Sequence, residues 1–120
     1  MTTIEELDNI RKAASLYAAG LQQGNLDLLK KAFHPQAMMY GPNMIVPIQG
    51  LFDYVSASTA PDKSGESHQC FITKIDCTGN AASVEMAQQS YQGINYINYF
   101  QLLKLEGNWF IVSKSFDVIQ

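Results

Sequence analysis

The chain has few side chains that could transfer a proton, namely 11 acidic residues and two histidines. Asp117, on the last expected strand, is the acid that could reach a pocket, and a solvated strand end is the alternative. His68, beside a loop-like segment, could act as a base or be solvated at a strand end. Seven other acids fall at expected helix starts or in turns, where we expect exposure: Glu5, Glu6, Asp8, Asp62, Glu66, Asp76 and Glu106.

Sequence motifs for metal, serine-hydrolase or phosphate chemistry do not occur. The chain has no H-x-H, H-E-x-x-H or G-x-S-x-G motif and no glycine-rich phosphate loop. His34 precedes Pro35 at an expected helix end, where capping or packing explains it. With two cysteines and no histidine at a ligand spacing, we expect neither a metal site nor a cofactor.

The two cysteines, Cys70 and Cys77, are expected to be free thiols. They lie seven positions apart in one expected strand, which predicts Cα atoms about 23 Å apart and side chains on opposite faces. A disulfide requires Cα atoms within about 7 Å of each other. Free thiols suit a reducing compartment, so we expect small buried apolar side chains in a cytoplasmic protein.

Composition and charge indicate a single folded domain over residues 1–120. Hydrophobic residues make up 47% of the chain and charged residues 16%, which excludes a disordered chain. The net charge of −3 argues against nucleic acid or an anionic membrane as partner, because both attract basic proteins. There is no apolar run of eighteen residues and the N-terminal segment is acidic, so we expect neither a spanning helix nor a signal peptide.

Two helices are predicted in the first 33 residues. Apolar residues at positions 7, 10, 14, 17 and 21 recur at helical spacing. Thr3 and Glu6 can form a capping box at the start of this helix, and Gly24 can end it. Asn25 can then cap a second helix over residues 26–33, which the following His-Pro pair ends.

The remaining sequence predicts one more helix and a long antiparallel meander. Short strands are expected over 37–40 and 44–48, a third helix over 51–58 and a mobile loop over 59–67. From His68 onward the chain alternates strands and turns, with a hairpin signal at Glu106-Gly107-Asn108. Helices followed by a run of strands predict the α+β class.

Four groups of residues occur in an order that carries a resemblance. The first is Tyr17-x-x-Gly20 with Gly24-Asn25-Leu26-Asp27, the second Phe33-His34-Pro35-x-Ala37 and the third Gly79-Asn80-Ala81-Ala82. The fourth is Asn98-Tyr99-Phe100-Gln101-Leu102-Leu103-Lys104 followed by Gly107-Asn108-Trp109 and Ile111-Val112-x-Lys114. In this order they resemble the nuclear transport factor two-like (NTF2-like) superfamily, and its SnoaL-like and putative lumazine-binding branches most of all.

The resemblance implies a cone-shaped α+β fold, a cystatin-like roll in which N-terminal helices pack on a strongly bent antiparallel sheet. The open end of the cone would hold a pocket with apolar and aromatic walls. A packed core is the alternative for its aromatic and methionine residues, and solvent exposure for the lysine. The candidate ligand-binding residues on the elements that flank the cone are Tyr17, Met38, Tyr40, Met44, Tyr96, Asn98, Phe100, Lys114 and Phe116.

Position 98 departs from the family pattern, which usually has aspartate there, and an amide satisfied by the backbone of the sheet is the alternative to a role in the pocket. Asparagine keeps the hydrogen-bonding shape but cannot accept a proton as a base. Our leading hypothesis is therefore a non-catalytic domain that binds a small hydrophobic or aromatic molecule. The alternative is an isomerase, dehydratase or cyclase in which Asp117 or His68 is the base and Tyr17 or Tyr40 donates a hydrogen bond.

A third hypothesis is a dimeric interaction module. Members of the superfamily commonly dimerise through the sheet, so the resemblance implies a homodimer. The contributors that we expect on this face are Gln88, Tyr91, Tyr99 and Phe110. A one-residue slip of strand register after Gly93 would exchange the pocket residues with those of the outer face.

Overall fold

The two N-terminal helices form where their caps predict them in the computed structural model, which describes residues 2–119. Helix α1 (Ile4–Gln23) follows Thr3, whose hydroxyl accepts a hydrogen bond from the backbone N–H of Glu6. It ends at Gly24, in the left-handed region at φ 65°. Helix α2 (Leu26–Ala32) is capped by Asn25, whose side chain accepts from two backbone N–H groups of the first turn.

The side chain of Glu6 does not complete the predicted capping box. Its carboxylate instead accepts hydrogen bonds from Trp109 Nε1 and from Lys104 Nζ. These donors lower the pKa of the Glu6 carboxyl. The start of α1 is thereby joined to the last two strands of the sheet.

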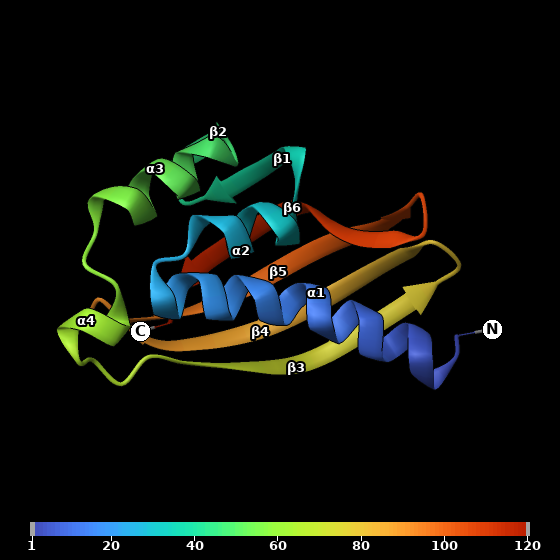
Figure 1. The fold of residues 1–120 in the computed structure, drawn as a ribbon, viewed down its shortest axis with the longest axis horizontal. Helices are drawn as coiled ribbons and strands as arrows, with labels where there is room; N and C mark the ends of the chain where they lie inside the picture. Colours follow the sequence, from blue (N-terminus) through green and yellow to red (C-terminus); the bar gives the residue numbers. More distant parts are fainter. Residues whose placement is uncertain (1, 120) are drawn as a thin grey trace.

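Six strands form one curved, mixed sheet in the order β2-β1-β6-β5-β4-β3 (Figure 1). Their bounds are β1 Phe33–Gly41, β2 Met44–Pro47, β3 Gln69–Thr78, β4 Ala81–Tyr91, β5 Ile94–Leu105 and β6 Asn108–Val118. The α+β class is confirmed, with one parallel pair, β1 with β6, in an otherwise antiparallel sheet. The pair is parallel because both strands start at the same end of the sheet, where Phe33 lies beside Ile111.

Register shifts interrupt the two-residue period of several strands. In β3 the shift lies between Ile72 and Lys74, and it places Cys70 and Cys77 on the same, half-buried face. The prediction of opposite faces was therefore wrong, because it assumed an unbroken period. Both thiols are free, and burial raises the pKa of Cys70 to about 12.

Helices α3 (Gln49–Ala57) and α4 (Pro61–Ser64) connect β2 to β3. A short helix occupies residues 61–64 of the expected mobile loop, since Pro61 suits a first helical turn and Gly65 ends it at φ 78°. Ala60 and Pro61 are buried against the rest of the chain. Helix α3 in this connection forms part of one wall of the candidate site.

The hydrophobic core lies between α1 and the sheet, which α1 crosses in Figure 1. Tyr17 is 2% exposed, and its ring packs edge-on against Phe100 with centroids 5.0 Å apart. On β4 the residues at 82, 84 and 86 are buried, as their alternation predicts. The packing of α1 fills the centre of the curved sheet.

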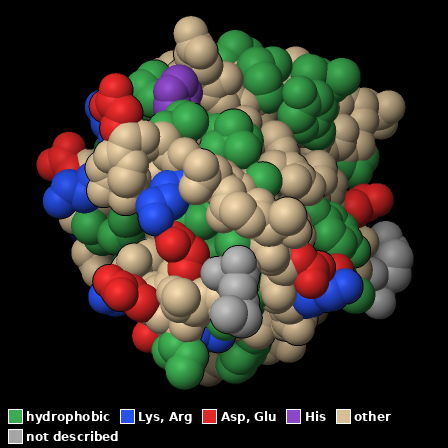
Figure 2. Space-filling model, turned by 90° about the vertical axis from the view of Figure 1, so that its right-hand side faces the viewer, with side chains coloured by type: hydrophobic (Ala, Val, Ile, Leu, Met, Phe, Trp, Pro, Cys, Tyr) green, Lys and Arg blue, Asp and Glu red, His purple; other side chains and the backbone are tan. Residues whose placement is uncertain are grey.

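The surface carries charges of both signs. In Figure 2, which looks at the end of the molecule where α1 begins, acidic and basic side chains alternate over the lower and left part. Hydrophobic side chains gather at the top of the same view. Within residues 2–119, every helix is too short or too polar to cross a membrane.

Replacement of Gly20 by alanine is predicted to destabilise the fold. A Cβ added at Gly20 would lie 2.6 Å from Cδ2 of Leu29 on α2. We expect Gly20→Ala to lower the free energy of unfolding in urea by about 1–3 kcal/mol, although alanine is intrinsically favoured in helices by about 1 kcal/mol. The exposed Ser15→Ala on the same helix is the control, and it should be neutral or slightly stabilising. A stabilised Gly20→Ala protein would contradict the packing argument.

Candidate functional site

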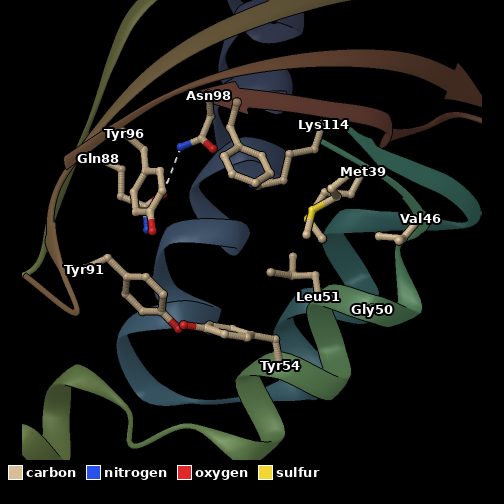
Figure 3. Close-up of a pocket in the computed structure, with 12 residues that line it drawn as sticks. Met39, Val46, Gly50, Leu51, Tyr54, Gln88, Tyr91, Tyr96, Asn98 and Lys114 are labelled. Atoms are coloured by element: carbon tan, nitrogen blue, oxygen red, sulfur yellow. Dashed lines mark hydrogen bonds between the residues drawn. The ribbon is translucent and has the colours of Figure 1, made fainter. Parts of the chain in front are cut away.

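A cavity of about 360 Å³ lies between the sheet and the β2–α3 segment (Figure 3). Residues of one helix and five strands line the cavity. Their side chains form largely apolar walls with a few polar atoms. The lining residues are Met39, Met44, Val46, Gly50, Leu51, Tyr54, Gln88, Tyr91, Tyr96, Asn98, Lys114 and Phe116. The volume falls within the range of small-molecule sites in proteins, roughly 300–1,000 Å³.

The edge strand β2 and the helix α3 form the apolar wall opposite the cavity residues of β4 and β5. Val46 faces the cavity, whereas its neighbour Ile45 is 70% exposed on the other side of β2. Leu51 and Tyr54 are three residues apart and therefore share a face of α3. The Tyr54 hydroxyl donates a hydrogen bond to the side-chain oxygen of Gln92, in the β4–β5 turn. This bond connects α3 to the sheet at the rim of the cavity.

A bulge near the end of β4 brings Gln88 and Tyr91 into the site. In a regular strand, residues three positions apart face opposite sides. The pairing with β5 shifts between Gln88 and Tyr91, with Ser90 at φ 59°, and both side chains face inward, 2% and 6% exposed. Their predicted place on the outer face was therefore wrong, whereas Tyr99 lies there, 48% exposed. Phe110 is half-buried.

A buried chain of hydrogen bonds runs along one side of the cavity. Gln88 Oε1 accepts from the Tyr17 hydroxyl at 2.8 Å and from Asn98 Nδ2 at 2.9 Å. Gln88 Nε2 lies 3.1 Å from His68 Nε2, and His68 Nδ1 lies 2.9 Å from Gln22 Oε1. Because the Gln22 oxygen only accepts, His68 carries its proton on Nδ1 and accepts from Gln88.

Burial lowers the pKa of His68, an effect that the nearby Glu66 carboxylate opposes. The ring therefore stays neutral in the neutral pH range. It is 8% exposed and also lies near the Cys70 sulfur, with Sγ 3.5 Å from Nε2. His68 reaches the cavity only through Gln88, so it is a positioning group for that amide.

Lys114 brings an unpaired amine into this apolar surrounding. The residue is 4% exposed, and its Nζ lies 3.8 Å from the Phe116 ring centroid and 5.7 Å from that of Tyr17. Burial lowers the pKa of Lys114 to about 7. Lys114 is not part of any ion pair within residues 2–119, where the pairs are Arg11–Asp8, Lys74–Asp76 and Lys104–Glu6.

Asn98 offers a second unpartnered polar atom. Its side chain points from β5 toward the cavity, and its Nδ2 is engaged by Gln88 (Figure 3). Its Oδ1 is buried and has no hydrogen-bond partner among residues 2–119. A buried acceptor without a partner costs about 1–3 kcal/mol, so a donor on a bound molecule would be favoured there.

The structure places the nine predicted ligand-binding residues in three regions. Five of them line the cavity: Met44, Tyr96, Asn98, Lys114 and Phe116. Tyr17 on α1 and Phe100 on β5 pack against each other in the core beneath it. Met38 and Tyr40 do not line it, because β1 turns Ala37 and Met39 inward. Their predicted place at the pocket was wrong by one residue of strand register.

The candidate base Asp117 is exposed and lies outside the cavity. Its carboxylate accepts a hydrogen bond from the backbone N–H of Val118, and its neighbour Phe116 faces inward. The structure thus leaves Asp117 at a solvated strand end. No group of three histidine, cysteine or acidic side chains that could hold a metal ion occurs within the described chain, residues 2–119.

Seven lining residues were not among the sequence candidates: Met39, Val46, Gly50, Leu51, Tyr54, Gln88 and Tyr91. The i, i+3 spacing of Leu51 and Tyr54 on the third predicted helix is a local signal for a shared face. Gln88 and Tyr91 could have been found only by anticipating the bulge in β4. Burial raises the pKa of Tyr91 to about 12.

A curved sheet wrapped around an N-terminal helix, with a cavity at its open end, defines the NTF2-like class. The profile of a family described as "Putative lumazine-binding" matches residues 5–117. The chain belongs to this family, and the resemblance to the NTF2-like superfamily is confirmed.

Two proteins of known structure share the fold over nearly their whole length, and a third protein is similar in sequence. An NTF2-like protein of unknown function from Shewanella baltica OS155 is 30% identical, with a TM-score of 0.91 over 100% of this chain and 98% of that chain. Another from Methylobacillus flagellatus KT is 25% identical, with a TM-score of 0.90 over 99% and 96%. Aldolase FrzH from Cladobotryum sp is 27% identical over 121 residues, 95% of this chain and 92% of that protein.

Replacement of Lys114 by methionine is predicted to stabilise the protein at neutral pH. The folded chain holds the pKa of Lys114 near 7, so between pH 7 and 10.5 the unfolded chain binds more protons and wild-type stability rises with pH. We expect Lys114→Met to raise the free energy of unfolding at pH 7 by a few kcal/mol. The gain should shrink as the pH approaches 10.

Denaturant titrations at a series of pH values measure this difference. The exposed Lys12→Met is the matched control, and it should change stability by less than about 0.5 kcal/mol. A Lys114→Met protein that is less stable than wild type at pH 7 would show that the amine stabilises the fold.

Proposed function

We propose that this chain binds a small apolar or aromatic molecule in the cavity and that Lys114 and Asn98 receive its polar group. The observation that carries the proposal is the pair of unpartnered polar atoms, Lys114 Nζ and Asn98 Oδ1, in a site with otherwise apolar and tyrosine walls. The ammonium or amine donates and the amide oxygen accepts. A ligand with an acceptor oxygen and a neighbouring donor would satisfy both.

The size of the cavity supports a ligand of about two rings. An apolar cavity of about 150 Å³ holds one benzene molecule, and this one has about 360 Å³. The family description points to lumazine, a flat bicyclic heterocycle with carbonyl oxygens and N–H groups. Its carbonyl oxygen would suit Lys114 and an N–H group would suit Asn98. Lumazine is therefore the first probe for the site.

A reaction on the bound molecule is the second candidate function. The similar chain named aldolase FrzH supports it, because an aldolase makes or breaks a carbon–carbon bond next to a carbonyl group. The residue that supports such chemistry in this chain is Lys114, whose amine lies in the cavity without a carboxylate partner. An acid–base reaction through Asp117 has no support, since that carboxylate is exposed.

Filling the cavity is predicted to abolish binding without unfolding the protein. Val46→Phe adds volume to the wall of the site, and we expect at least a tenfold loss of lumazine affinity, measured by quenching of ligand fluorescence. Ile45→Phe is the matched control, because the neighbouring residue is 70% exposed and faces away from the cavity. It should keep wild-type affinity. Equal affinities of Val46→Phe and wild type would place binding elsewhere.

We also propose a homodimer through the outer face of the sheet. A row across this face contains Ile45, Tyr40 and Tyr99, which are 70%, 39% and 48% exposed. Phe71 on β3 adds a further aromatic ring, 51% exposed. Exposed apolar side chains on one face support a self-complementary interface.

Light scattering after size exclusion tests the dimer. We expect a dimeric mass at micromolar concentration and a monomeric mass for Tyr99→Arg, because a buried unpaired charge opposes association. Ile4→Arg, at an exposed position at the start of α1, is the control and should remain dimeric. A monomeric wild-type protein would contradict the proposal.

A further inference from the structure

The surroundings of Lys114 contain no carboxylate, and the groups that favour its charged form are the rings of Phe116 and Tyr17, whose centroids lie 3.8 and 5.7 Å from Nζ. Its neighbours across the strands are Phe100 on β5 and Met39 on β1, and Phe116 follows on its own face. The titratable side chains that face the cavity from other elements are tyrosines, Tyr54 on α3, Tyr91 on β4 and Tyr96 on β5. Burial raises the pKa values of Tyr91 and Tyr96, and that of Tyr17 behind the cavity, so these three hydroxyls are neutral in the neutral pH range.

Apart from Asn98 Oδ1, which has no partner, the polar groups of the network near Lys114 are already engaged. Tyr17 donates to Gln88, and Gln88 donates to His68. The Nζ atom lies in a cavity large enough for a ligand, and Figure 3 shows its side chain among the lining residues. An amine that is held free of ion pairs in an apolar site has the properties of a nucleophile, because only the neutral form carries a lone pair.

We propose that Lys114 forms a Schiff base with an aldehyde or ketone group of a small apolar molecule bound in the cavity. The proposal rests on the proposed binding function and names the chemical class of ligand that this function would serve. A Schiff base differs from an ion pair between Lys114 and a ligand carboxylate. The ion pair would need the ammonium form of the lysine and would form no covalent bond.

The reaction balances without an oxidant, a reductant or a further reactant. The Nζ lone pair attacks the carbonyl carbon, a C–N bond forms, and the carbonyl π electrons move to the oxygen. Both hydrogens of the amine are transferred to that oxygen, which leaves as water while the C=N bond forms. Protonation of the imine nitrogen from solvent then gives the iminium ion, and hydrolysis reverses the sequence.

The electrostatics of the site support the first step. An ordinary exposed lysine, with a pKa near 10.4, is about 0.04% neutral at pH 7. Burial lowers the pKa of Lys114 to about 7, so roughly a thousand times more of its amine is in the reactive form. Part of this advantage is lost because a less basic amine is a weaker nucleophile.

Reductive trapping tests the proposal on the intact protein. Benzaldehyde and sodium cyanoborohydride convert an imine into a stable benzylamine, which peptide mass spectrometry locates. We expect a single adduct at Lys114 at pH 7.5, formed at least tenfold faster than at any of the six other lysines: Lys12, Lys30, Lys31, Lys63, Lys74 and Lys104. The adduct should disappear in Lys114→Met and in Lys114→Arg. It should be reduced at least tenfold in Val46→Phe and unchanged in Ile45→Phe.

Benzyl alcohol separates failure of this proposal from failure of the binding function. It has the size of benzaldehyde but no carbonyl group, and its binding is measured by ligand-observed NMR. If benzyl alcohol binds wild type and not Val46→Phe, while Lys114 reacts no faster than the exposed lysines, the Schiff base is refuted and the binding function stands. If neither binding nor an adduct is found, both proposals fail.

Discussion

The hydrogen bonds of the Gln88 side chain determine which polar atoms the cavity presents. Its oxygen accepts from Tyr17 and Asn98, and its nitrogen donates to His68. If the Gln88 amide were reversed, its N–H₂ group would face two donors, the Tyr17 hydroxyl and Asn98 Nδ2. Its oxygen would face His68 Nε2, which must accept because Nδ1 of the same ring donates to Gln22. One orientation therefore satisfies the whole network, which joins α1, β4 and β5 to the segment before β3. The same bonds occupy the amide nitrogen of Asn98 and leave its oxygen free.

The network needs no further group to fill the cavity beside it. Lys114 differs from the network, because folding alone does not account for a lysine at this position. Except for Asn98 Oδ1, the polar atoms on one side are mutually satisfied, so they require neither water nor a further side chain. Lys114, between Phe100 and Met39 in adjacent strands, gains nothing comparable. A protein in which apolar side chains of similar volume replace buried charged groups is often as stable as the original, or more stable. A buried amine without a partner is therefore evidence for a role toward a bound molecule.

The sequence predicted those parts of the fold that local signals determine. Thr3, Asn25 and Gly24 mark helix ends, and the turn at Glu106-Gly107 has two residues at positive φ, as a two-residue hairpin requires. The residues of the site were predicted less well, because the face of the sheet on which a side chain lies depends on its odd or even position along the strand. The bulge at Ser90 depends on the curvature of the whole sheet, which no local pattern records. The wall from α3 depends likewise on where a distant segment packs.

The residues at positions 98 and 114 have to be understood together. Asn98 pairs with Phe116 and Lys114 pairs with Phe100, so the two polar side chains are diagonal neighbours on the inner face of β5 and β6, a geometry that sets residues about 7–8 Å apart and their Cβ atoms somewhat closer. An aspartate at 98, as in the family pattern, would set a carboxylate within reach of the amine, favour the ammonium and raise the pKa of Lys114. Asparagine carries no charge, so desolvation acts on the lysine alone. Asn98 thus supplies neither a carboxylate base nor a counter-charge to the amine, and both properties agree with the proposed reaction of Lys114 with a carbonyl group.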